Sequence, residues 1–182
     1  MDSLASINQA LEVVGARNGI EGFLLNAEGV CSFGYRGTEI QLEYLSSAEV
    51  LQVCAPLVSI EAVADGDGER GLYRMLLSLN LSHPDLLGTN FAIHSGESLV
   101  VLQDRITAGQ CSAGNLEERL STFLWLVEIW TRRLLEFRSL EELRHSVSRI
   151  EADEIELDLL GNAGIEPPAT PHFPSGIDRR FA

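Results

Sequence analysis

The sequence predicts an α+β fold in which helices flank an antiparallel sheet, in the order α-β-β-β-α-β-β-α. The first observation is a set of three short apolar runs, at 30–35, 39–45 and 50–60, with turn residues between them. This spacing favours antiparallel strands, because a parallel return needs a dozen or more residues. The second is a long helical stripe of apolar residues that follows position 115. We expect one domain over residues 1–150 and a separate tail over 151–182.

Residues 3–17 predict an amphipathic helix, because four apolar residues recur at spacings that keep them on one helical face: Leu4, Ile7, Leu11 and Val14. Asn18 and Gly19 supply its C-terminal stop. The run at 39–45 alternates apolar residues with the polar side chains of Glu39, Gln41 and Glu43. That alternation predicts a strand with one buried and one hydrated face.

The second half of the domain predicts a short helix, a hairpin and a long helix. The short helix covers 69–81 and ends before Pro84. Strands at 90–94 and 99–106 flank the Gly-containing turn SGES. Asn115 is expected to open the longest helix through a capping-box pattern with Glu118. From residue 161 onward four prolines and no periodicity predict an irregular or disordered tail.

Composition narrows the class of partner. The net charge is −14, and all 13 basic residues are arginine. This acidic excess repels phosphate groups, so nucleic acid and anionic membranes are disfavoured as partners. The N-terminal residues lack a secretion signal, and no apolar run reaches the ~18 residues that span a bilayer. Three cysteines, Cys31, Cys54 and Cys111, form no CxxC motif and suit a reducing compartment. We therefore expect a cytoplasmic protein without membrane insertion.

The sequence carries no strong enzyme signature. GDGERG at 66–71 matches the dinucleotide-binding pattern, but the charges of Asp67 and Glu69 oppose a pyrophosphate, and a hairpin follows the helix instead of a parallel strand. The four histidines are not spaced for zinc. We expect no catalytic activity, no cofactor and no metal site. A Cys–His catalytic pair stays an alternative, since such partners need not be neighbours in sequence.

Several segments resemble one family in their order along the chain. They are LLNAEGVCSFGYRGTEIQLEYL as paired strands, EVLQVCAPLVSI as a third strand, LYRMLLSLNL as a short helix and FAIHSGESLVVLQDRI as a hairpin. With the first and last helices, this order is similar to the class I type III secretion chaperones, the Tir-chaperone family, over about residues 3–145. The tail lies beyond the part that resembles the family.

The resemblance implies a cytoplasmic bacterial homodimer without catalysis. It would bind the N-terminal region of type III effector proteins in extended form and keep them soluble and export-competent; the secretion ATPase is a further implied partner. The implied partner-binding residues are Leu4, Leu25, Phe33, Tyr35, Ile40 and Leu42. The implied dimer interface comprises Leu72, Met75, Leu79, Phe91 and Ile93. Physically, an extended chain can add main-chain hydrogen bonds at a sheet edge and place alternate side chains in pockets.

The alternative is a regulatory protein of the same fold, which sequesters an activator or an export-control protein. Co-purification distinguishes the two hypotheses. A secretion chaperone returns secreted substrates, whereas a regulator returns a single regulatory protein.

Overall fold

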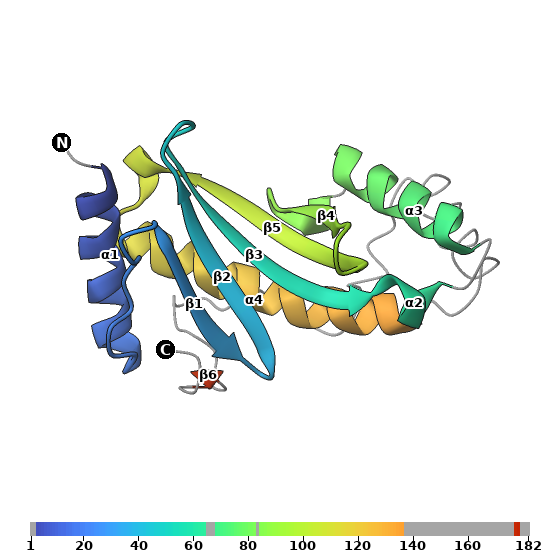
Figure 1. Ribbon diagram of the computed structural model, residues 1–182, viewed down its shortest axis with the longest axis horizontal. Coiled ribbons are helices and arrows are strands. Elements are labelled where there is room, and N and C mark those ends of the chain that lie inside the picture. Colours follow the sequence, from blue (N-terminus) through green and yellow to red (C-terminus); the bar gives the residue numbers. More distant parts are fainter. Residues whose placement is uncertain (1–2, 65–67, 83, 137–176, 179–182) are drawn as a thin grey trace.

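The computed structural model describes residues 3–64, 68–82, 84–136 and 177–178. Its strands form one antiparallel sheet in the order β4-β5-β3-β2-β1-β6 (Figure 1). The predicted α+β fold is confirmed, with a strand added at one edge. The strands are β1 (Val30–Tyr35), β2 (Thr38–Leu45), β3 (Val50–Ser59), β4 (Asn90–His94), β5 (Leu99–Thr107) and β6 (Ile177–Asp178).

The helices cover one face and the two ends of this sheet (Figure 1). The longest helix, α4, runs along one face and contacts β3, while α1 packs against α4 at one end. At the other end α3 contacts the edge strand β4. Within the described ranges no helix is long and apolar enough to cross a membrane. The helices are α1 (Ser3–Asn18), the single turn α2 (Ile60–Val63), α3 (Gly68–Ser82) and α4 (Ala113–Glu136), with 3-10 turns at Pro84–Leu86 and Ala108–Gln110.

The strand alternation read from the sequence sets the two faces of the sheet. Ile40 and Leu42 on β2 are fully buried, and they pair with Phe33 on β1 and Val53 on β3. Because directly opposite residues share a face, these side chains form the layer that the helices cover. The other face is partly exposed and more polar, as at Gln52.

A half-exposed arginine and a buried carboxylate fix α1 to α4. Glu117 is 4 % exposed, and its two oxygens accept hydrogen bonds from Arg17 Nη1 at 2.9 Å and Asn18 Nδ2 at 3.1 Å. Arg17 and Asn18 lie in the last turn of α1. A buried charge is tolerated only when it is paired, so this contact fixes where the first helix ends against the fourth.

One sequence expectation about the end of an element is wrong. The cap of α4 is Ser112, whose hydroxyl accepts a bond from the Asn115 N–H at 3.4 Å and whose carbonyl accepts one from Leu116 at 2.8 Å. Asn115 is therefore inside the helix, and its amide donates to the Gln110 carbonyl at 2.6 Å instead of capping. In the described part of the tail, Ile177 and Asp178 form β6, which no periodicity predicted. The part of the expected 1–150 domain that follows Glu136 lies outside the described residues.

Candidate functional site

The outer edge of β1 presents main-chain groups to a further strand. Tyr35 pairs with β2 across the hairpin turn, so its N–H and C=O face β2, and those of Gly34 face outward. The Val30 carbonyl shows the same alternation, because it accepts a bond from the Asn26 N–H at 2.8 Å outside the sheet. The outward positions are therefore Val30, Ser32 and Gly34.

The tail strand β6 takes this edge. It runs antiparallel to β1, with Asp178 opposite Gly34 and Ile177 opposite Tyr35. Because Gly34 faces outward, the Gly34–Asp178 pair is the one that exchanges hydrogen bonds. The edge thus accepts an extended chain, and an antiparallel chain in this register enters from the side of the β1–β2 turn.

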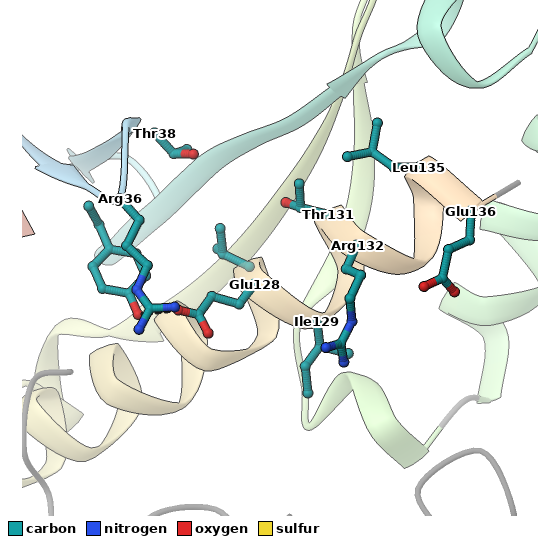
Figure 2. Close-up of a pocket in the computed structure, with 10 residues that line it drawn as sticks. Arg36, Thr38, Glu128, Ile129, Thr131, Arg132, Leu135 and Glu136 are labelled. Atoms are coloured by element: carbon teal, nitrogen blue, oxygen red, sulfur yellow. Dashed lines mark hydrogen bonds and ion pairs between the residues drawn. The ribbon is translucent and has the colours of Figure 1, made fainter. Parts of the chain in front are cut away.

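A groove of about 750 Å³ opens at the same turn, between the β1–β2 hairpin and the second half of α4 (Figure 2). The helix supplies apolar walls, including Ile129, which is 7 % exposed, and Leu135, which is 47 % exposed. Charges of both signs also line it, from Arg36, Arg132, Glu128 and Glu136. Tyr35 lines the groove and also pairs with β6, so the groove and the strand edge adjoin each other.

A small polar cluster holds the hairpin against α4. The Tyr35 hydroxyl donates to Glu128 Oε1 at 2.8 Å, and Arg36 forms an ion pair with the same carboxylate (Figure 2). The Arg36 guanidinium also lies 5.6 Å from the centroid of the Tyr35 ring. Burial, and then the hydrogen bond to Glu128, raises the pKa of Tyr35. The phenol therefore stays protonated at neutral pH and keeps donating, which fixes one wall of the groove.

The cysteine thiols in the structure are poorly suited to catalysis. Burial raises the pKa of Cys31 and Cys54, and it raises the pKa of Cys111 to about 11. At neutral pH these groups are protonated, whereas the thiolate is the nucleophile. In the described part of the chain no group of three His, Cys, Asp or Glu side chains is placed to hold a metal ion.

Most of the predicted partner-binding side chains lie in the core. Leu4 is half-buried at the margin of the core, while the other five are at most 4 % exposed: Leu25, Phe33, Tyr35, Ile40 and Leu42. Contact by Leu25, Phe33, Ile40 and Leu42 would require the core to open, whereas Tyr35 also lines the groove. The strand β1 that carries two of them nevertheless reaches the surface through its main chain. Their assignment as contact residues stays a prediction.

The predicted dimer residues divide in the same way. Four of them are buried and at most 5 % exposed: Leu72, Met75, Leu79 and Phe91. Ile93 is 39 % exposed. The outer side of α3 instead exposes Leu77 and Leu81, at 68 % and 85 %. The α3–β4 region thus presents an apolar surface, but largely through residues other than those predicted.

No local pattern in the sequence predicted the groove. Arg36 follows the strand pattern as a turn residue, and Glu128 reads as a hydrated position on a helix. Their meeting depends on how the hairpin packs against α4, which no local pattern encodes. The RG pair of the turn was the available signal: Gly37 has φ +83° and Arg36 has φ +49°, as the tight two-residue turn requires.

Comparison with known proteins agrees with this architecture. Residues 9–131 match the Tir chaperone protein (CesT) family. A chain in the crystal structure of the ExsC–ExsE complex is similar with a TM-score of 0.64 and 27 % identity, over 74 % of this chain and 97 % of that chain. No match was found among curated proteins.

A chain in the structure of the HopA1–SchA chaperone–effector complex has a TM-score of 0.57 over 74 % of this chain and 96 % of that chain. Its 14 % identity makes this a likeness of fold alone. The family match extends from the middle of α1 almost to the end of α4, and so includes β1 and most of the groove-lining helix. The chain belongs to the Tir chaperone protein (CesT) family.

Proposed function

We propose that the protein is a type III secretion chaperone of the bacterial cytoplasm. It binds the N-terminal region of secreted effector proteins in extended form and keeps them soluble and export-competent. The family match supports the chaperone class, and the two similar structures are complexes of such folds with a protein partner. The observation that carries the proposal is the edge of β1, which pairs with an extended segment beside a groove.

In this proposal the effector segment runs antiparallel to β1 and continues into the groove. Main-chain bonds to Gly34 and Ser32 supply affinity that does not depend on the effector sequence. Side chains near the turn meet the apolar wall at Leu135. Leu135 is 47 % exposed, so burial of its exposed part contributes about half of the roughly 1.5–3 kcal/mol that a fully exposed leucine gives, and an aspartate there would add the cost of desolvating a carboxylate.

The test compares two variants that introduce a carboxylate on equally exposed leucines. Leu135→Asp changes the groove, and Leu87→Asp changes the loop before β4, the strand at the opposite edge of the sheet; the two leucines are 47 % and 48 % exposed. Tagged protein is used to capture secreted proteins from its native cytoplasm, and the N-terminal segment of each one identified is titrated by calorimetry. We expect Leu135→Asp to weaken binding by about tenfold or more, and Leu87→Asp to leave it unchanged.

Equal affinity of both variants and the wild type would remove the groove from the proposal. Capture of no secreted protein would overturn the chaperone function itself. Capture of one activator or export-control protein in place of secreted substrates would favour the alternative, a regulator of the same fold. Contact with the secretion ATPase stays a prediction from the family resemblance.

We also propose that the protein is a homodimer. The exposed leucines of α3, Leu77 and Leu81, and the half-exposed Ile93 on β4 supply an apolar surface that a second copy can cover. Light scattering at micromolar concentration should report about twice the chain mass of 19.9 kDa. Leu81→Asp should shift the protein toward the mass of one chain without loss of its circular dichroism, because Leu81 is 85 % exposed. A wild-type monomer at that concentration contradicts the proposal.

A further inference from the structure

We infer that the C-terminal segment around Ile177–Asp178 is a built-in occupant of the partner-binding edge of β1, and that a partner strand has to displace it. The identity of the edge as a partner site rests on the proposed function. The occupation of the edge by the chain's own segment rests on the observed pairing of β6 with β1.

The pairing leaves no room for two strands at the same position. Asp178 lies opposite Gly34, whose N–H and C=O face outward from the sheet. Each of these main-chain groups takes one ladder bond, so a partner strand cannot pair with Gly34 while Asp178 does. The two occupants therefore exclude each other directly, by competition for the same atoms.

The strand β6 lies at the end of β1 that adjoins the groove. Ile177 lies opposite Tyr35, and Tyr35 is also a wall residue of the groove. A partner strand that continued from the groove onto β1 would meet β6 at its first two pairing positions. The segment thus blocks the junction between the groove and the strand edge.

The pairing of β6 with β1 is short enough for a longer partner strand to displace it. The segment is part of the same chain, so its docking is intramolecular and independent of protein concentration. It pairs with Gly34 and Tyr35, whereas the next outward position, Ser32, lies beyond its two residues. A partner strand that also covers Ser32 makes more ladder bonds than the described residues Ile177 and Asp178 do. The segment therefore protects the edge while it is empty and yields to a longer strand.

The first test changes one main-chain donor. In the full chain, Asp178→Pro removes the N–H that faces Gly34, and Asp178→Ala keeps it as the matched control. The readout is amide hydrogen exchange by NMR. We expect the Gly34 amide to exchange about two- to tenfold faster in Asp178→Pro than in the wild type or Asp178→Ala, because its acceptor has left. The Phe33 amide faces β2 and should be unchanged in all three. Equal Gly34 exchange in all three proteins overturns the inference.

The second test supplies the segment in trans. A fluorescent peptide of residues 172–182, HFPSGIDRRFA, is titrated into each full-length protein and followed by anisotropy. If the edge is occupied in cis about 50–90 % of the time, the peptide should bind Asp178→Pro about two- to tenfold more tightly than the wild type or Asp178→Ala. Equal binding to all three proteins, or binding to none, overturns the inference.

A third measurement separates this inference from the proposed function. The N-terminal segment of a captured secreted protein is titrated into the wild type and Asp178→Pro. Tighter binding to Asp178→Pro supports displacement. Equal binding overturns displacement and leaves the chaperone function in place. If no secreted protein is captured but the first two tests succeed, the chaperone function is overturned, while the occupation of β1 by its own segment stands.

Discussion

Removal of the Arg119 side chain should destabilise the protein strongly, because Arg119 pairs with a carboxylate in the core. Asp104 lies on β5 and is 2 % exposed. Its oxygens accept a bond from Arg119 Nε at 3.0 Å, a second from Arg119 Nη2, and a third from the main-chain N–H of Arg105 at 2.8 Å. Arg119→Ala removes two of these three donors and leaves the carboxylate buried.

The expected decrease in the free energy of unfolding follows from the two hydrogen bonds that Arg119→Ala removes. A hydrogen bond to a charged group contributes about 1.5–3 kcal/mol, so two of them give about 3–6 kcal/mol. Breaking a buried ion pair by removing one partner costs about 3–5 kcal/mol, which is consistent. In a chain of this length 1 kcal/mol corresponds to about 2–4 °C, so the thermal midpoint should fall by roughly 6–20 °C.

The assay is urea and thermal unfolding followed by circular dichroism, with Arg105→Ala as the matched control. The Arg105 side chain is exposed on the other sheet face, where it bonds Gln52 at 3.2 Å, and its main-chain N–H to Asp104 survives the substitution. We expect this control to change the free energy of unfolding by at most about 0.5 kcal/mol. A double variant with apolar residues of similar size at positions 104 and 119 should recover most of the loss. A loss below about 1 kcal/mol in Arg119→Ala would refute the reasoning.

Two further predictions concern single positions. Because its folded-state pKa is raised, Tyr35 contributes stability that is fully present below about pH 10 and is lost as the pH rises above that value, by up to about 1.4 kcal/mol per pH unit. Urea unfolding at pH 9 and pH 11 should show this loss in the wild type and a smaller one in Tyr35→Phe; equal losses would contradict it. Gly15→Ala places a Cβ 2.7 Å from both the Ile20 carbonyl oxygen and Phe23 Cβ. Although alanine favours a helix by about 1 kcal/mol, the overlap should give a net destabilisation of about 1–3 kcal/mol in urea unfolding. A more stable variant would contradict it.

The strands and the first helix could be predicted from sequence because their signals are local. The alternation of apolar and polar residues predicted β2, and the observed strand begins one residue before the expected one, at Thr38. The stripe of α1 is buried at Ile7, Leu11 and Val14, as the helical period predicted. Gly19 has φ +69°, which is the left-handed conformation expected at the helix stop. In each case the residues that form the pattern are close together in the sequence.

The position of the proposed binding surface could not be predicted, because the period of a strand says which residues share a face and not whether that face is covered. Phe33 and Ile40 share the face expected to meet a partner, but α4 and α1 pack over that face and leave both at most 1 % exposed. Replacement of either by Asp should therefore unfold the protein and cannot serve as a binding test. The tail strand was missed for a related reason. Two residues carry no detectable period, and their pairing with β1 depends on contacts between distant parts of the chain.

The burial of the apolar faces has a consequence for partner choice. With its inner face in the core, β1 can offer a partner its outward main-chain groups at Ser32 and Gly34, which recognise extended backbone of any sequence. Selection by side chains is then left to the groove, where the charges of Arg36 and Arg132 are balanced by those of Glu128 and Glu136. Such a lining does not select a partner segment by its net charge. Leu135 favours an apolar residue in the partner. Partners that share an extended segment with one apolar residue near the turn should therefore bind without sharing a sequence motif. A single effector bound through one charged side chain, with no loss in Leu135→Asp, would contradict this division of roles.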